Sequence, residues 1–237
     1  GGRRGRWCVW PIIAVLLISI IAYGTVKFAT GHMEGHTRAR GHDLDALIGG
    51  GALHDYNDRG TMSLVSTAFN HGEPIPSRYT ADGNDWSPPL SWSGVPAGTG
   101  SLVLFCDDHV SSSPIRSHGD GFSHWVIYDV PPSVSRIEEH MGHTARVSVY
   151  QDDAPGSDVT IYQGLNSWGD GSHGYKGPDP SKRTGLHYYV FAVFALDGTL
   201  GLDPEEATRE VVRKAMKSKK VLGYGTLIGT YQRFYDD

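Results

Sequence analysis

The sequence predicts a mainly β (α+β) domain that follows one N-terminal transmembrane helix. Three observations lead to this prediction. The 237 residues include 31 Gly and 13 Pro, a content that favours turns and short strands over a helical bundle. Several β-branched and aromatic runs are bounded by Gly, Pro, Asp or Ser, which is typical of strands. Residues 7–26 carry no charge, and this length is enough to cross a bilayer.

The uncharged N-terminal run has the features of a retained membrane anchor. At about 1.5 Å per residue, Trp7 to Val26 covers roughly the 30 Å hydrocarbon layer. A cleavable signal sequence or a buried core helix is the alternative, but a signal sequence normally has a shorter apolar core. Arg3, Arg4 and Arg6 precede the run, and basic flanks stay on the cytoplasmic, matrix or stromal side. We therefore expect a single-pass protein, with an organelle inner membrane suspected and the globular domain on the opposite side.

Composition divides the chain into three parts. Residues 1–30 are the basic segment and the transmembrane helix. Residues 31–60 are rich in Gly and His, lack periodicity and predict a flexible linker. Residues 61–237 carry the strand-like runs and form the globular domain.

Within the globular domain, four runs predict strands and one predicts a helix. The strand-like runs are Ser63–Ser66, Ser101–Phe105, His124–Tyr128 and Tyr188–Phe194. The helix is expected from about Pro204 to Lys219, with Asp203 as its N-cap, acidic residues in its first turn and lysines at its end. An ordinary packed surface helix explains this pattern.

Charge, cysteines and motifs exclude several functions. A net charge of −5 without a clustered basic face does not indicate nucleic-acid binding. Cys8 and Cys106 lie in unrelated apolar runs, so we expect neither a disulfide nor a Cys-based metal site. A G-x-S-x-G elbow, a P-loop and an H-E-x-x-H motif are all missing from the sequence. We expect no cofactor, no metal and no enzyme, because no nucleophile stands out beside a base.

An ordered set of short motifs resembles the bacterial-type phosphatidylethanolamine-binding proteins. In chain order they are Ser66–Phe69, Ile75-Pro76, Tyr79-Thr80, Ser87–Trp92, Val95-Pro96, His124–Val126, Val130-Pro131, Gly174-Tyr175, Gly177-Pro178, Gly185–His187, Ala195–Asp197 and Leu227–Arg233. Each motif is weak alone, but together they cover nearly all of residues 61–237 in the family order. The resemblance implies a large central antiparallel sheet, a smaller second sheet and peripheral helices.

The resemblance also implies a small pocket that binds phosphate or phospholipid headgroups. Its ligand-binding residues would be Asp108, His124, Gly177, Pro178, His187 and Tyr189. Histidine and tyrosine can each donate to a phosphate oxygen, a neighbouring carboxylate fixes a histidine tautomer, and a Gly-containing loop offers backbone N–H groups. Two positions depart from the family pattern, because Val110 replaces a second acid and Tyr188 replaces an arginine.

Two functions remain open at this stage. The first is a non-catalytic accessory or structural subunit of a larger membrane protein complex, anchored in the lipid bilayer. The alternative is a regulatory or sensing module that binds a phospholipid headgroup or a small anion such as phosphate. An inert pocket with a structural Asp–His pair is also compatible with the sequence. A kinase-regulating role, known in some relatives, fits poorly with a domain placed across the membrane from the cytoplasm.

Overall fold

The computed structural model describes residues 61–110, 122–149, 158–169, 171–182 and 184–234. The predicted transmembrane helix in residues 1–30 and the predicted linker in residues 31–60 lie outside this part of the chain. Among the described residues, no helix combines the length and the apolar character that a bilayer crossing needs.

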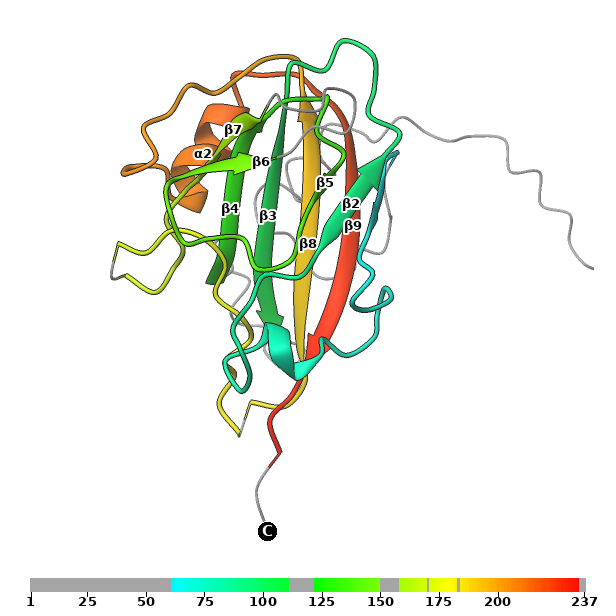
Figure 1. Cartoon of the computed structure of the whole chain (residues 1–237), viewed down its shortest axis with the longest axis vertical. Helices are drawn as coiled ribbons and strands as arrows, with labels where there is room; N and C mark the ends of the chain where they lie inside the picture. The colour runs from blue at the N-terminus through cyan, green and yellow to red at the C-terminus, as the bar shows by residue number, and fades with distance from the viewer. Residues whose placement is uncertain (1–60, 111–121, 150–157, 170, 183, 235–237) are drawn as a thin grey trace, which may run out of the picture. The chain divides into compact units, whose positions relative to one another are not determined.

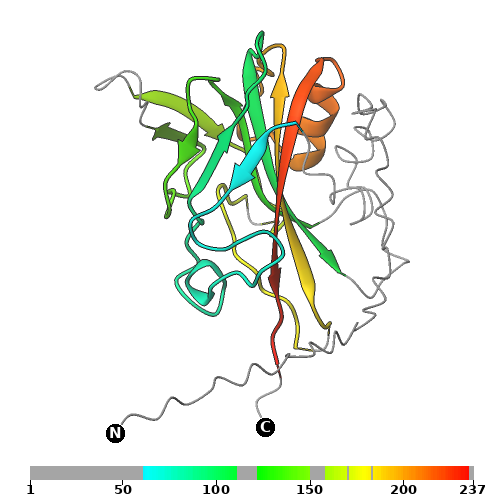
Figure 2. The same cartoon turned by 90° about the vertical axis from the view of Figure 1, so that its right-hand side faces the viewer.

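Two antiparallel sheets form the described domain (Figures 1 and 2). The small sheet has the order β1-β2-β5, and the central sheet has the order β6-β7-β4-β3-β8-β9. The strands are β1 (Ser63–Val65), β2 (Leu90–Ser93), β3 (Ser101–Val110), β4 (Phe122–Val130), β5 (Arg136–Ile137), β6 (Arg146–Val149), β7 (Val159–Gln163), β8 (His187–Leu196) and β9 (Val221–Tyr231). A 3₁₀ turn covers Ser77–Tyr79, and one α-helix, α2, covers Arg209–Met216. The predicted mainly β fold with two sheets and few helices is confirmed.

The central sheet is buried on both faces. Figure 2 shows the small sheet on one side of it and α2 on the other, and we call these the small-sheet face and the helix face. The small-sheet face packs a core that includes Trp92, Trp125 and Phe191, whereas the helix face packs Phe105 and Phe194 against α2. Burial on both faces explains why β3 and β8 are long hydrophobic runs rather than alternating ones.

The expected helix start is wrong. Instead of Asp203, the N-cap is Thr208, whose side chain accepts a hydrogen bond from the Val211 N–H. Asp203 and Pro204 form a separate turn, in which the Glu206 N–H donates to the Asp203 carbonyl. Acidic residues after a proline produce the same sequence signal in a turn as in a first helical turn, so the pattern placed the start several residues too early.

A buried ion pair attaches α2 to the central sheet. Arg209 Nε donates to Asp107 Oδ2 at 2.7 Å, and both residues are at most 5% exposed. The Arg209 guanidinium also lies 5.3 Å from the centre of the Phe105 ring. A charge removed from water in this way is tolerated only with a partner, so the pair fixes the helix over β3.

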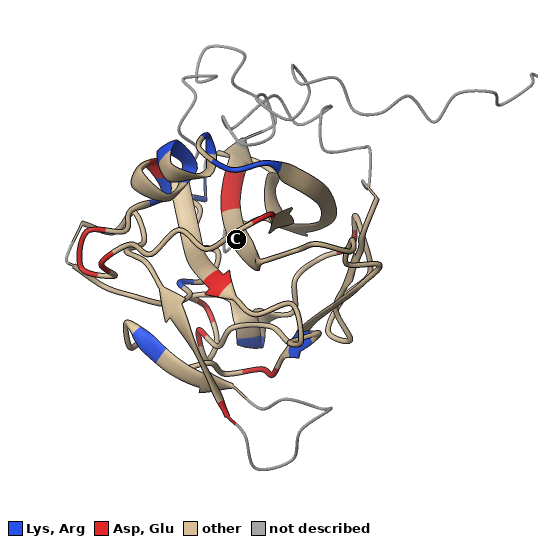
Figure 3. Cartoon of the chain, turned by 90° about the horizontal axis from the view of Figure 1, so that it is seen from above, with Lys and Arg blue, Asp and Glu red and all other residues tan. Residues whose placement is uncertain are grey.

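The end of α2 is strongly basic (Figure 3). The cations are Arg213, Lys214, Lys217, Lys219 and Lys220. None of them forms an ion pair with another residue in the described part of the chain. Positive charge at a helix C-terminus complements the helix dipole, as the sequence predicted.

Removing one partner of the buried pair should destabilise the domain. We expect Arg209→Met to lower the free energy of unfolding by about 3–5 kcal/mol, because Asp107 is left charged and buried. The double variant Arg209→Met with Asp107→Leu should recover most of this loss. Urea unfolding measures both values, and Glu138→Gln, at an exposed pair with Arg136, is a control expected to change by about 0.5 kcal/mol or less. A double variant as unstable as Arg209→Met would contradict the explanation.

Candidate functional site

A β-bulge in β4 directs His124 into the site. Cys106 pairs with Trp125 and Asp107 pairs with Ser123, so His124 has no partner on β3. Bulges commonly re-aim a side chain in this way. Because of the bulge, His124 does not follow the regular in-and-out alternation of side chains along β4. The Nε2 atom of His124 lies 3.9 Å from Asp108 Oδ2.

Asp108 and His187 form the centre of the site. The His187 Nδ1–H donates to the Asp108 carboxylate, with distances of 2.9 and 2.8 Å to its two oxygens. The register between β3 and β8 explains why Asp108 contacts His187. Asp108 lies opposite Tyr189 on β8, and His187 is two residues away along that strand. Both belong to the small-sheet face, on the opposite side of the sheet from the Asp107–Arg209 pair.

Burial determines the chemical state of His124. Its Nδ1–H donates to the Lys176 carbonyl at 2.6 Å, so Nε2 carries a lone pair in the neutral ring. Burial lowers the pKa of His124 below its ordinary value of 6.5, although the Asp108 carboxylate acts in the opposite direction. We therefore expect a neutral imidazole at pH 7.

Tyr189 provides a buried hydroxyl whose neighbouring acceptor is the Asp108 carboxylate. The residue is fully buried, and its hydroxyl has no well-formed hydrogen bond to another described residue. Burial, followed by the negative charge of Asp108, raises the pKa of this hydroxyl above its ordinary value. Tyr189 therefore remains a protonated donor next to the Asp108–His187 pair. A buried donor without a well-formed hydrogen bond is costly, which makes it the most informative group of the site.

One loop contacts both histidines. The Lys176 carbonyl accepts from His124, and the Thr184 hydroxyl lies 2.8 Å from His187 Nε2. The Thr184 O–H donates to the Ser181 carbonyl at 2.7 Å, so its oxygen faces His187 Nε2 as an acceptor. The residues from Lys176 to Thr184 thus set the hydrogen bonding of the two site histidines.

Gly177 and Pro178 shape this loop rather than offering free donors. The Gly177 N–H already donates to Asp85 Oδ1 at 2.6 Å, and the Pro178 carbonyl accepts from the Ala81 N–H. A Cβ at Gly177 would lie 2.5 Å from the Tyr79 carbonyl oxygen, so glycine is required there. The expected backbone donation from Gly177 to a ligand is therefore not available in this structure.

The C-terminal end of β9 fixes the middle of the loop. Arg233 donates to Asp82, with Nε at 2.7 Å from Oδ2, and it also donates to Asp179 and to the Pro180 carbonyl. The Tyr231 hydroxyl donates to the same Asp82 carboxylate at 2.6 Å. One arginine therefore joins the loop to two other segments.

Aromatic rings surround His124. Its ring centre lies 4.8 Å from Trp168, 5.4 Å from Phe122 and 5.0 Å from Tyr189, each in an edge-on arrangement. Phe122 is 43% exposed and Trp168 is half-buried. The polar groups thus lie beside an apolar, partly exposed rim.

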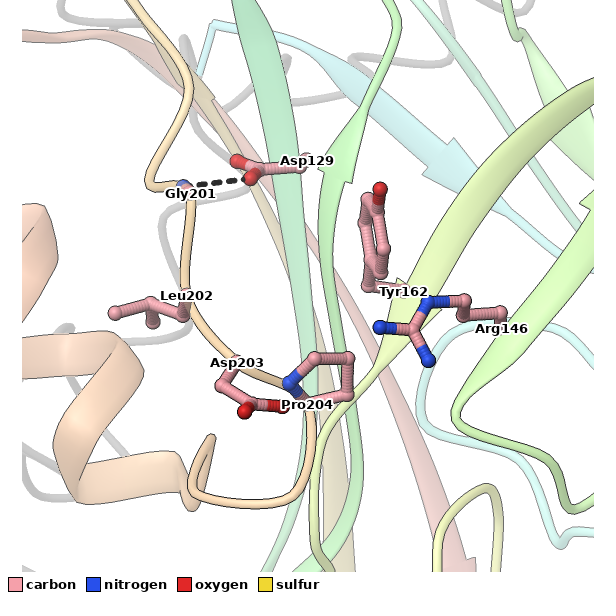
Figure 4. Close-up of a pocket in the computed structure, with 7 residues that line it drawn as sticks. All are labelled: Asp129, Arg146, Tyr162, Gly201, Leu202, Asp203 and Pro204. Atoms are coloured by element: carbon pink, nitrogen blue, oxygen red, sulfur yellow. Dashed lines mark hydrogen bonds between the residues drawn. The ribbon is translucent and has the colours of Figure 1, made fainter.

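A separate surface hollow of about 410 Å³ lies elsewhere on the domain (Figure 4). It is lined by Asp129, Arg146, Tyr162, Gly201, Leu202, Asp203 and Pro204. The Asp129 carboxylate accepts from the Leu200 and Gly201 N–H groups, and Arg146 lies over the Tyr162 ring. This hollow contains none of the predicted ligand residues.

The structure brings together Asp108, His124, His187 and Tyr189 from three strands, with Gly177 and Pro178 in the loop beside them. Sequence reasoning missed Thr184, Asp85 and the rim residues Phe122 and Trp168. It also found no nucleophile beside a base, and this stays a prediction. The available signal for Thr184 was its position three residues before His187.

Fold and site define a two-sheet β protein that carries a buried Asp–His–Tyr cluster at one end of its central sheet. The family profile described as phosphatidylethanolamine-binding protein matches residues 65–232. A protein of Methanothermobacter thermautotrophicus, named UPF0098 protein, is 42% identical over 172 residues, which are 73% of this chain and 99% of the relative. The chain therefore belongs to the phosphatidylethanolamine-binding protein family.

Solved structures agree with this assignment. A putative phosphatidylethanolamine-binding protein homologue of Chlamydia trachomatis is 34% identical, with a TM-score of 0.56 over 73% of this chain and 98% of its own. Escherichia coli YbcL is similar in fold, with a TM-score of 0.59 and 23% identity over 73% of this chain and 99% of its own. Because the matched region makes up nearly the whole archaeal relative, that region is a complete protein there.

The state of His124 can be measured by NMR. We expect nitrogen spectra to place the proton on Nδ1, and we expect the folded-state titration midpoint to lie below the ordinary 6.5 because burial disfavours the charged ring. The unfolded protein then binds more protons at this residue, so its contribution to stability is complete above pH 6.5 and is lost as the pH falls toward the folded pKa. A midpoint at or above that of the urea-unfolded chain would contradict this assignment.

The contribution of Arg233 should depend on pH. Hydrogen bonds from Arg233 and then Tyr231 lower the pKa of Asp82 below its ordinary 3.8, so its stabilising effect is present above that value and is lost at lower pH. We expect Arg233→Gln to melt at a lower temperature than the wild type at pH 7. The difference in melting temperature should shrink as the pH falls below 3.8. A difference that stays constant down to pH 3 would argue against this role of Asp82.

Proposed function

We propose that the domain binds a small phosphate-bearing ligand, such as a phosphomonoester or a phospholipid headgroup. The observation that carries this proposal is the Tyr189 hydroxyl, a fully buried donor that lies beside Asp108 without a well-formed hydrogen bond among the described residues. A phosphate oxygen is a strong acceptor and would satisfy it. The neighbouring histidines and the partly exposed aromatic rim support a ligand with a polar head and an apolar remainder.

Electrostatics require a proton to accompany the phosphate. Asp108 is a carboxylate, and neutral His124 offers a lone pair rather than an N–H toward it. A phosphate dianion placed here favours the protonated form of His124, since an opposite charge nearby raises a histidine pKa. Binding should therefore take up a proton and strengthen as the pH falls from 8 toward 6.

A second candidate function rests on the uncharged run of residues 7–26. We propose that this run tethers the domain to a membrane, where it serves as an accessory subunit of a larger complex. Native-gel analysis after mild detergent extraction, with mass spectrometry of the co-migrating proteins, tests this role. A monomer under every gentle extraction would count against it, whereas a defined assembly would support it.

Removing the Tyr189 hydroxyl should weaken phosphate binding. Calorimetric titration of residues 61–237 with phosphoethanolamine and with inorganic phosphate compares a headgroup with the bare anion. We expect Tyr189→Phe to reduce affinity for both about ten- to hundredfold, which is the loss of one hydrogen bond to a charged group.

Tyr162→Phe is the matched control, because it removes a hydroxyl from the hollow in Figure 4 and should leave affinity unchanged. Equal affinities of the wild type and Tyr189→Phe would refute the proposed site. Tighter binding of phosphoethanolamine than of phosphate would identify a headgroup as the better ligand.

A further inference from the structure

Five cations gather where α2 leads into β9, and we call them the basic patch. They lie within the eight residues 213–220 and are Arg213, Lys214, Lys217, Lys219 and Lys220. None of the five forms an ion pair in the described part of the chain. Arginines elsewhere do have carboxylate partners, as in the pairs of Arg78 with Glu139 and of Arg233 with Asp82. The basic patch therefore presents uncompensated positive charge.

The neighbouring acidic residues do not neutralise the patch. Glu210 is the one acidic residue in the sequence from 209 to 220, and it lies one turn before Lys214. The carboxylate of Asp197, just after β8, accepts a hydrogen bond from the Lys220 N–H. Lys214, Lys217 and Lys220 are exposed, so their charges face solvent. Because salt screens exposed charges over about 8 Å, the patch acts locally as a positive surface despite the net charge of −5.

The described domain begins at the same end of the central sheet as the patch. The Met62 N–H donates to the Tyr224 carbonyl at 2.9 Å, and a Cβ at Gly223 would lie 2.7 Å from Thr61 Oγ1. Gly223 follows Lys220 by three residues along the chain. The uncharged run of residues 7–26 precedes this point in the sequence. A chain held in a membrane by that run would therefore join the domain at its basic end.

We propose that the basic patch docks the domain on an anionic lipid surface. Clusters of about four to eight Lys and Arg residues on an amphipathic helix are typical of segments that bind anionic bilayers. The helix α2 has this character, because Val212 and Met216 are buried against the sheet while Lys214 and Lys217 are exposed. The proposal goes beyond ligand binding and beyond a tether, because it assigns a lipid-contacting surface to the domain itself.

Docking through the patch leaves the candidate site accessible. The register places His187 opposite Tyr231 at one end of β8, and Leu196 opposite Val221 at the other. Figure 1 shows β8 running the length of the sheet between these ends, and its 10 residues span about 30 Å at about 3.3 Å each. Lys220 directly precedes Val221, so the patch lies at the end away from His187. A docked domain therefore presents the site to the aqueous phase.

Co-sedimentation with vesicles tests the proposal on residues 61–237, the region that is nearly the whole archaeal relative. This region lacks the uncharged run, so a tether cannot contribute. We expect binding to vesicles of phosphatidylcholine and phosphatidylglycerol in equal parts, weakening as salt is added, and none to phosphatidylcholine alone. The triple variant Lys214→Gln, Lys217→Gln, Lys220→Gln should bind about a hundredfold more weakly, because each cation near the surface contributes a factor of about five.

The triple variant Arg78→Gln, Arg136→Gln, Arg146→Gln is the matched control, because it removes three exposed positive charges outside the patch. It should bind anionic vesicles like the wild type. Equal weakening of both triple variants, or equal binding of the wild type to both kinds of vesicle, would overturn the proposal. Binding to an RNA oligonucleotide without binding to anionic vesicles would also overturn it. Phosphate titrations separate the two functions, since unchanged phosphate affinity in a protein that ignores vesicles would reject only lipid docking.

Discussion

Asp107 and Asp108 are neighbours on β3, and strand alternation turns their carboxylates to opposite faces of the central sheet. On the helix face, Asp107 pairs with Arg209 and fixes α2. On the small-sheet face, Asp108 receives His187 and lies beside His124. A shift of β3 by one residue would exchange the two faces, leaving α2 without its anchor and the site without its acid. The register of one strand thus controls both the packing of the domain and its chemistry.

The loop from Lys176 to Thr184 supplies hydrogen-bonding partners to the two histidines that the strands position. The strands position the ring of each histidine, and the loop supplies the Lys176 carbonyl and the Thr184 oxygen that the rings contact. Arg233 holds this loop from the far end of β9, where it is bonded to Asp82 and Asp179. The hydrogen bonding of the site therefore depends on residues outside the cluster of Asp108, His124, His187 and Tyr189.

Hydrophobic runs predicted the long strands because β3, β4 and β8 are apolar on both faces. The predicted start of the helix failed because a Pro-containing turn imitates a helix N-terminus. The family resemblance placed Asp108 and His187 in one pocket, and strand register accounts for their contact. The bulge at His124 was not predictable, because it arises from strand pairing that leaves no local sequence pattern. The contact of His124 with the Lys176 carbonyl was equally unpredictable, since every residue has a backbone carbonyl and the sequence does not mark this one.

The site also ties ligand chemistry to the folding of the whole domain. Its central hydrogen bond joins residues separated by 79 positions, and the bond from His124 to the Lys176 carbonyl spans 52. Contacts between such distant segments form only after the loop-closure entropy of the intervening chain has been overcome. Partly folded chains therefore carry separate aspartates, histidines and hydroxyls with ordinary reactivity. The assembled cluster is a property of the native topology. It forms during refolding only when the strands of the central sheet have paired.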